Sequence, residues 1–138
     1  MKSLLSLTGF LALALCGCGG GSGQADLSGE VTLDGKPLPQ GSLLLVPTDP
    51  SKGGTAGGEI KDGRFALTGK QAPGIGEYKV EIHANKPSGR KVQKAMGKPG
   101  ELDDELIEAV ASRFNTKSEL RVEVKPGGST TKFEVFSR

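Results

Sequence analysis

The stretch that decides the fold is Gly29–Pro47, which reads GEVTLDGKPLPQGSLLLVP. Val31 and Leu33 alternate with polar neighbours, the period-two pattern of a strand with one buried face. The Asp34-Gly35 dipeptide follows, and it favours a type I′ turn because both residues tolerate a positive φ. After two prolines, the apolar run Ser42–Val46 is typical of a strand covered on both faces. We therefore expect a tight turn after the first strand, and prolines that redirect the second strand to another part of the fold.

The same alternation continues along the chain, and turn-forming dipeptides such as Asp62-Gly63 and Pro73-Gly74 separate the alternating segments. Seven segments are predicted to be strands: Leu27–Leu33, Ser42–Val46, Ala56–Ile60, Arg64–Leu67, Glu77–Ala84, Leu120–Val124 and Lys132–Phe136. Seven short strands with turns between them are the number expected for a small sandwich. The sequence therefore predicts an all-β, seven-stranded antiparallel β-sandwich over residues 26–138.

The composition is that of a single small domain. The chain has 138 residues, and 18 basic against 16 acidic side chains give a net charge of +2. A nucleic-acid-binding protein would need a clustered basic face, so no nucleic-acid partner is predicted. There is no Trp and there are only six aromatic residues, five Phe and one Tyr. We expect a modest core made of Leu, Val and Ile, and no small-molecule substrate is identified.

The N-terminus reads as an export signal. Lys2 precedes the apolar segment Leu4–Leu15, which is shorter than the roughly 20 residues of a membrane-spanning helix and matches the apolar region of a signal peptide. The residues Leu15-Cys16-Gly17-Cys18 resemble the bacterial lipobox. This resemblance implies a lipoprotein signal peptide over residues 1–17, cleavage between Gly17 and Cys18, and lipid attached to Cys18.

Acylation of Cys18 would anchor the protein, because two or more acyl chains, such as palmitate, hold a protein stably on a membrane. Two alternatives stay open: an ordinary secretory signal cut at a nearby small residue, and a metal site at Cys16 and Cys18. After cleavage no second Cys would remain, so no disulfide is predicted. Residues 18–25 are rich in Gly and Ser, which predicts a flexible tether.

A long crossover loop is predicted over residues 85–118. Asn85–Gly100 is basic and Glu101–Glu108 is acidic. A loop of this length is either functional or mobile. One interpretation is a short helix over Asp103–Ser112. The other, which we favour, is an extended crossover whose three apolar side chains enter the core: Ile107, Val110 and Phe114.

Candidate chemical residues are few. His83 is the only histidine, and the alternation places it on the outer face of its strand, whereas a metal site needs several converging ligands. The acidic run Asp103–Glu105 lacks the spacing of an EF-hand. Tyr78 is expected to pack in the core with its hydroxyl bonded near a strand corner, rather than to stack a sugar with Phe114. No catalytic, cofactor-binding or metal-binding residue is predicted, and the chain is not expected to be an enzyme.

A set of motifs in a fixed order carries a family resemblance: Leu15–Cys18, Gly29–Leu38, Val46-Pro47, Asp62–Phe65, Pro73-Gly74, Gly76–Val80, Arg113–Leu120 and Val122–Gly128. The set resembles small planctomycete envelope lipoproteins with a carboxypeptidase regulatory-like or transthyretin-like domain. Phe114 stands where such sequences more often carry Tyr. The resemblance implies a β-sandwich, secretion and a lipid anchor, and it implies no catalytic residue.

The sequence thus predicts a secreted, non-catalytic protein that is lipid-anchored to a bacterial envelope membrane, on its periplasmic face or at the cell surface. Its role would be structural, or the binding of an envelope protein partner that the sequence does not name. That partner could extend a sandwich edge strand or dock on the charged crossover. The alternative is a ligand-binding module for an envelope glycan or a metal ion.

Overall fold

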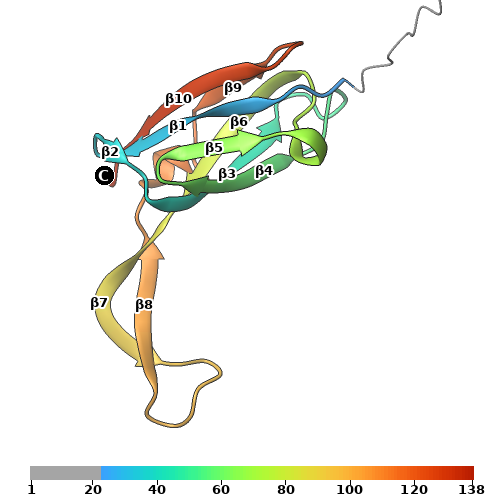
Figure 1. Ribbon diagram of the computed structural model, residues 1–138. Helices are drawn as coiled ribbons and strands as arrows, with labels where there is room; N and C mark the ends of the chain where they lie inside the picture. The colour runs from blue at the N-terminus through green and yellow to red at the C-terminus, as the bar shows by residue number, and fades with distance from the viewer. Residues whose placement is uncertain (1–22) are drawn as a thin grey trace, which may run out of the picture.

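The computed structural model describes residues 23–138, and this part of the chain is all-β, as predicted (Figure 1). Two single-turn 3₁₀ helices, Gly69–Gln71 and Ser112–Phe114, lie between strands. The ten strands of residues 23–138 are β1 (Leu27–Leu33), β2 (Lys36–Pro37), β3 (Gln40–Pro47), β4 (Ala56–Lys61), β5 (Arg64–Leu67), β6 (Gly76–His83), β7 (Asn85–Gln93), β8 (Leu102–Glu108), β9 (Arg121–Val124) and β10 (Ser129–Val135). The seven predicted strands are all present, and β2, β7 and β8 are additional.

Eight of these strands form one curled sheet, the body, in the order β10-β1-β5-β4-β3-β6-β9, with the short β2 beside β1. Neighbouring strands pair antiparallel except β1 and β10, which are parallel. The sheet curls into a half-barrel, so its two edge strands, β9 and β10, lie close to each other (Figure 1). This arrangement does not confirm a seven-stranded sandwich, which stays a prediction.

The turn predicted at Asp34-Gly35 is confirmed. Asp34 has φ 51° and Gly35 has φ 81°, both in the region that a type I′ turn requires. After the turn, the chain runs antiparallel to β1 for only two residues, those of β2, which pair with the end of β1. The prolines then divert the chain, and β3 pairs with β4 and β6 rather than with β1. The opening stretch therefore links two separate parts of the sheet.

The expectation that Ser42–Val46 is covered on both faces is wrong. Leu43 and Leu45 are buried, but Leu44 between them is 37% exposed. The physical reason is that β3 lies in the middle of the curled sheet, whose inner face holds the core while its outer face meets solvent. Continuous apolar runs suit strands that are covered on both sides, and nothing in the described chain covers this side.

The core lies inside the curl. Its buried side chains come from every strand of the body except β2, and also from the segment that follows β8. Tyr78 is 1% exposed, and its hydroxyl donates to the carbonyl oxygen of Gly74 at 3.0 Å, which confirms the predicted role at a strand corner. Val110 is buried in the core and Phe114 packs against it. The segment after β8 is therefore part of the packed body.

The predicted signal peptide, with its cleavage site at Gly17 and lipid-bearing Cys18, lies outside the described residues. The end of the predicted tether is bonded to the body at the corner before β6. Ala25 N–H donates to Pro73 O at 3.0 Å, and Ile75 N–H donates to Gly23 O at 2.7 Å. The chain therefore enters the body at the end where β1 and β6 begin.

Candidate interaction arm

Residues Asn85–Glu108 form a two-stranded ribbon, called the arm below, which projects from the body (Figure 1). The arm replaces the predicted crossover loop over its first 24 residues, since β7 pairs antiparallel with β8. No helix forms over Asp103–Ser112 apart from the single turn at its end, and Ile107 is 43% exposed rather than in the core. Of the three apolar side chains expected to enter the core, Val110 is buried in it, and Phe114 is only partly buried and packs against it.

The basic block Asn85–Gly100 forms β7 and most of the tip of the arm, and the acidic block Glu101–Glu108 forms the rest of the tip and β8. Arg90 Nε lies 2.9 Å from Glu105 Oε2, and Lys91 Nζ lies 2.8 Å from Asp104 Oδ1. The hydrogen bond and the negative charge of Asp104 raise the pKa of Lys91. Exposed pairs of this kind contribute little to stability, because solvent screens them. They nevertheless explain why an extended ribbon forms here, because opposite charges face each other only when the two blocks pair as strands.

The arm exposes apolar side chains that no element of the described chain covers. A two-stranded ribbon is marginally stable alone because it has no second layer against which to bury a face. Five large apolar side chains lie on the arm in solvent: Val92 at 42% exposed, Met96 at 99%, Leu102 at 60%, Leu106 at 59% and Ile107 at 43%. An element that exposes several large apolar side chains on both of its faces is a candidate interaction site. The arm is therefore the strongest candidate for a functional surface.

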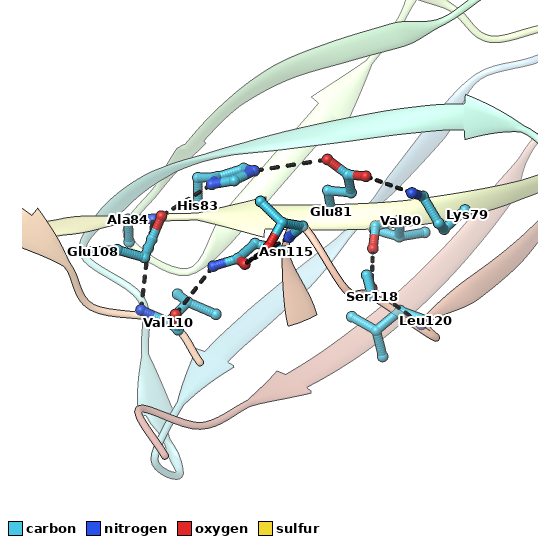
Figure 2. A network of polar contacts seen from close by, with 11 residues as sticks. Lys79, Val80, Glu81, His83, Ala84, Glu108, Val110, Asn115, Ser118 and Leu120 are labelled. Carbon is cyan, nitrogen blue, oxygen red and sulfur yellow. Dashed lines mark hydrogen bonds and ion pairs between the residues drawn. The ribbon is translucent and has the colours of Figure 1, made fainter. Parts of the chain in front are cut away.

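The arm is fixed to the body by the carboxylate of Glu108 (Figure 2). Its Oε1 accepts the backbone N–H of Ala84 at 2.9 Å and that of Val110 at 3.1 Å. Its Oε2 lies 2.9 Å from Nδ1 of His83, which donates because a carboxylate only accepts. One side chain thus joins the last residues of β6 to the residue where the chain re-enters the core.

A line of polar side chains continues from this point along the outer face of β6. His83 Nε2 lies 3.8 Å from Glu81, whose other oxygen lies 2.6 Å from Lys79 Nζ. Burial alone would raise the pKa of Glu108, but the hydrogen bonds from Ala84, His83 and Val110 and the charge of His83 outweigh it and lower that pKa. His83 lies on the outer face as predicted, where both ring nitrogens face carboxylates.

Two buried polar side chains that sequence reasoning missed hold the segment after the arm. Asn115 is 3% exposed, and its amide donates to Val110 O at 3.1 Å. The Ser118 hydroxyl donates to Val80 O, and Val80 N–H donates to Leu120 O at 2.9 Å. The signal available was the polar run Asn115–Glu119 between Phe114 and Leu120, which reads as an ordinary surface loop unless its burial is known. The Asn115 bond closes the returning segment on itself, and the bonds of Ser118 and Leu120 tie that segment to Val80 of β6 (Figure 2).

The described chain brings together few groups suited to metal or sugar binding. Within residues 23–138, no three His, Cys, Asp or Glu side chains gather closely enough to hold a metal ion. An open groove of about 1100 Å³ runs over the outer face of the body, with Leu44 and Ala66 among its lining. The aromatic ring beside it, Phe65, is only 4% exposed and stacks on Phe133 in the core. The groove therefore offers a sugar no open aromatic platform among the described residues.

No family model, curated protein or solved structure matches this chain. The resemblance to planctomycete lipoproteins accordingly remains an inference from its own motifs. In the part of the chain that the structure describes, no helix is long and apolar enough to cross a membrane.

Proposed function

We propose that this chain is a secreted, lipid-anchored protein of a bacterial envelope, which presents the arm to a partner protein without catalysing a reaction. In this proposal the body is a scaffold of the transthyretin-like or carboxypeptidase regulatory-like sandwich type, and Cys18 carries the lipid. The observation that carries the proposal is the placement of the two ends of the body. The N-terminal segment enters at one end, and the arm leaves from the other (Figure 1).

Strand β6 connects these two ends directly. It begins at Gly76, next to the corner that binds Gly23 and Ala25, and it ends at His83, which only Ala84 separates from the arm. Eight extended residues span about 26 Å, and the seven residues of β8 add about 23 Å. In the proposal, the anchored N-terminal segment and the arm therefore lie at opposite ends of β6.

The chemistry at the base of the arm supports a binding role over a catalytic one. The oxygens of Glu108 are occupied by two backbone N–H groups and by His83. A general base needs a free position facing a substrate proton. The polar groups at this site hold structure in place, and the accessible surface of the arm is apolar and charged, as expected for protein contact.

Proximity labelling in the native cell tests the proposal. The matched variant replaces residues 85–108 by Asn-Gly, which suits a tight turn because Ala109 N–H already donates to Ala84 O at 2.7 Å. We expect the full chain to label a reproducible set of envelope proteins. The deletion also removes Glu108, so the armless variant is first shown to unfold cooperatively in urea. It should then fractionate with the same membrane and lose that set. Identical labelling by the two chains would refute the role of the arm.

The anchor is tested separately by mass spectrometry of the mature N-terminus. We expect an acylated Cys18 as the first residue, and loss of membrane association in the variant Cys18→Ser. An unmodified N-terminus at any other residue would contradict the anchor while leaving the role of the arm open to the labelling experiment.

A further inference from the structure

We propose that the outer edge of β8 binds an extended, basic segment of the partner protein as an added β-strand. This inference rests on the proposed function, since it specifies how the arm would recognise its partner. Strand addition at an exposed sheet edge combines backbone hydrogen bonds, which give affinity, with alternating side-chain contacts, which give specificity.

The register of the arm determines which backbone groups of β8 face outward. Leu102 pairs with Gln93, and in the adjacent residue pair Lys94 N–H donates to Glu101 O at 2.9 Å. Hydrogen-bonded and non-bonded pairs alternate in an antiparallel ladder, so Leu102 belongs to a non-bonded pair. The same alternation continues to the other end of β8, where Ala109 N–H donates to Ala84 O. The outward N–H and C=O groups of β8 are therefore those of Leu102, Asp104, Leu106 and Glu108.

The outer edge of β7 is blocked, whereas that of β8 is regular. Pro87 pairs with Leu106 and has no N–H to donate. Between Pro87 and Lys91 the register shifts through a bulge, in which Gly89 has φ 89°. Prolines and bulges are the devices that protect edge strands from pairing with other chains. Strand β8 has neither over its seven residues, so it is the open edge of the arm.

The side chains of β8 define the partner. Leu102, Asp104 and Leu106 share one face of the ribbon, and the opposite face carries acidic Asp103 and Glu105 with Ile107. A strand added beside β8 would place its side chains about 4.5–5.5 Å from these residues, where opposite charges attract and like charges repel. Because Glu105 and Asp104 already pair with Arg90 and Lys91 across the ribbon, a basic residue of the added strand would share their carboxylates from the other side. The complementary segment therefore has Lys or Arg next to apolar residues.

A second copy of this chain is a poorer occupant of the same edge. Two β8 strands paired edge to edge would place acidic residues beside acidic residues, and the outer edge of β7 from another copy is interrupted by Pro87 and the bulge. The basic segment must displace one local hydrogen bond, because the Asp103 carboxylate accepts the N–H of Asp104 at 2.9 Å. The backbone of the added strand supplies an acceptor in its place.

The test uses the full-length chain in uncharged detergent and a nine-residue probe peptide in which lysine and valine alternate. Amide hydrogen exchange is followed by NMR as the peptide is added. We expect slower exchange at Leu102, Asp104 and Leu106, with little change at Asp103, Glu105 and Ile107. A peptide with glutamate in place of lysine, and a peptide N-methylated at alternate residues, should each bind at least about tenfold more weakly, as expected for the loss of charge pairs or of two or more net hydrogen bonds.

Two variants at one position separate backbone from side-chain effects. Leu106→Pro removes an outward N–H while leaving the β7–β8 ladder bonds, and Leu106→Ala keeps that N–H. We expect at least about tenfold weaker binding for the proline variant than for the alanine variant. Equal binding by the two variants, protection at Lys91 and Gln93 instead, self-association without peptide, or no binding at millimolar peptide would overturn the inference. If labelling of native partners still requires the arm, the proposed function stands without it.

Discussion

Replacing Glu108 by alanine should uncouple the arm from the body. The side chain of Glu108 accepts the N–H groups of Ala84 and Val110, and these two residues are each 4% exposed. Alanine at position 108 leaves both donors without an acceptor in a place that water reaches poorly. The variant Glu108→Gln is the matched control, because its amide oxygen can still accept both bonds while the charge is lost.

The expected loss follows from the two orphaned donors. A buried N–H without a partner costs about 1–3 kcal/mol, and the side chain of Glu108 is 36% exposed, so partial access of water places the total near 2–4 kcal/mol. For Glu108→Gln we expect about 1 kcal/mol, since only the charge-assisted part of the bonds is lost. The difference between the variants measures the acceptor role of Glu108 alone.

Urea unfolding gives the free energies, and amide exchange gives the location of the effect. We expect exchange in residues 85–108 to accelerate in Glu108→Ala while core amides such as those of Val80 and Ile82 stay protected against local opening. Stability of Glu108→Ala within about 0.5 kcal/mol of Glu108→Gln, with unchanged exchange in the arm, would refute the view that these bonds fix the arm.

Three further outcomes follow from the structure. The pKa of Glu108 is lowered below its ordinary value of 4.5, so the stability that its charge contributes should be complete above pH 4.5 and should disappear as pH falls through the folded-state pKa. Urea unfolding measured at decreasing pH should therefore bring the free energies of unfolding of Glu108→Gln and the parent chain together below pH 4.5. A difference that stays constant with pH would contradict this. Tyr78→Phe removes the hydroxyl bonded to Gly74 and should cost about 1 kcal/mol in urea unfolding; an unchanged midpoint would show that this bond contributes nothing net. Leu45→Ala should cost about 2–5 kcal/mol because Leu45 is fully buried, while Leu44→Ala on the exposed face should cost less than about 1 kcal/mol, and similar losses would contradict the one-sided burial of β3.

The turns and strands of the body were predictable because their signals are local. Asp34-Gly35 and Asp62-Gly63 adopt the positive φ angles that their residue types tolerate. Alternation in β6 and β9 depends on immediate neighbours, and it identified Tyr78 as buried and His83 as outward-facing. The burial of Leu44 was mispredicted because an apolar residue does not reveal whether a second layer exists to cover it.

The arm was predictable in part. Its two charge blocks are visible in the sequence, but the blocks permit a loop, a helix or a ribbon, and only the pairing of Lys91 with Asp104 decides among them. The role of Glu108 was not predictable, because its partners Ala84 and Val110 donate through the backbone and leave no trace in side-chain type.

By itself, the sequence determined the all-β class, the position of seven of the eight body strands and the tight turns, because each depends on residues a few positions apart. The tertiary structure alone decided that β1 lies parallel to β10, with Leu27 opposite Ser129. It also decided that β5 pairs with β4 at a single residue pair and then with β1. Finally, it decided that residues 85–108 project from the body as a two-stranded ribbon. These features depend on contacts between residues distant in the chain, such as the N–H of Ser137 on the carboxylate of Asp34. The conformational preference of a short segment does not specify which distant strand it will pair with. The order of the strands in the sheet, and the unpaired edge of β8, are therefore decided only by the packing of the whole chain.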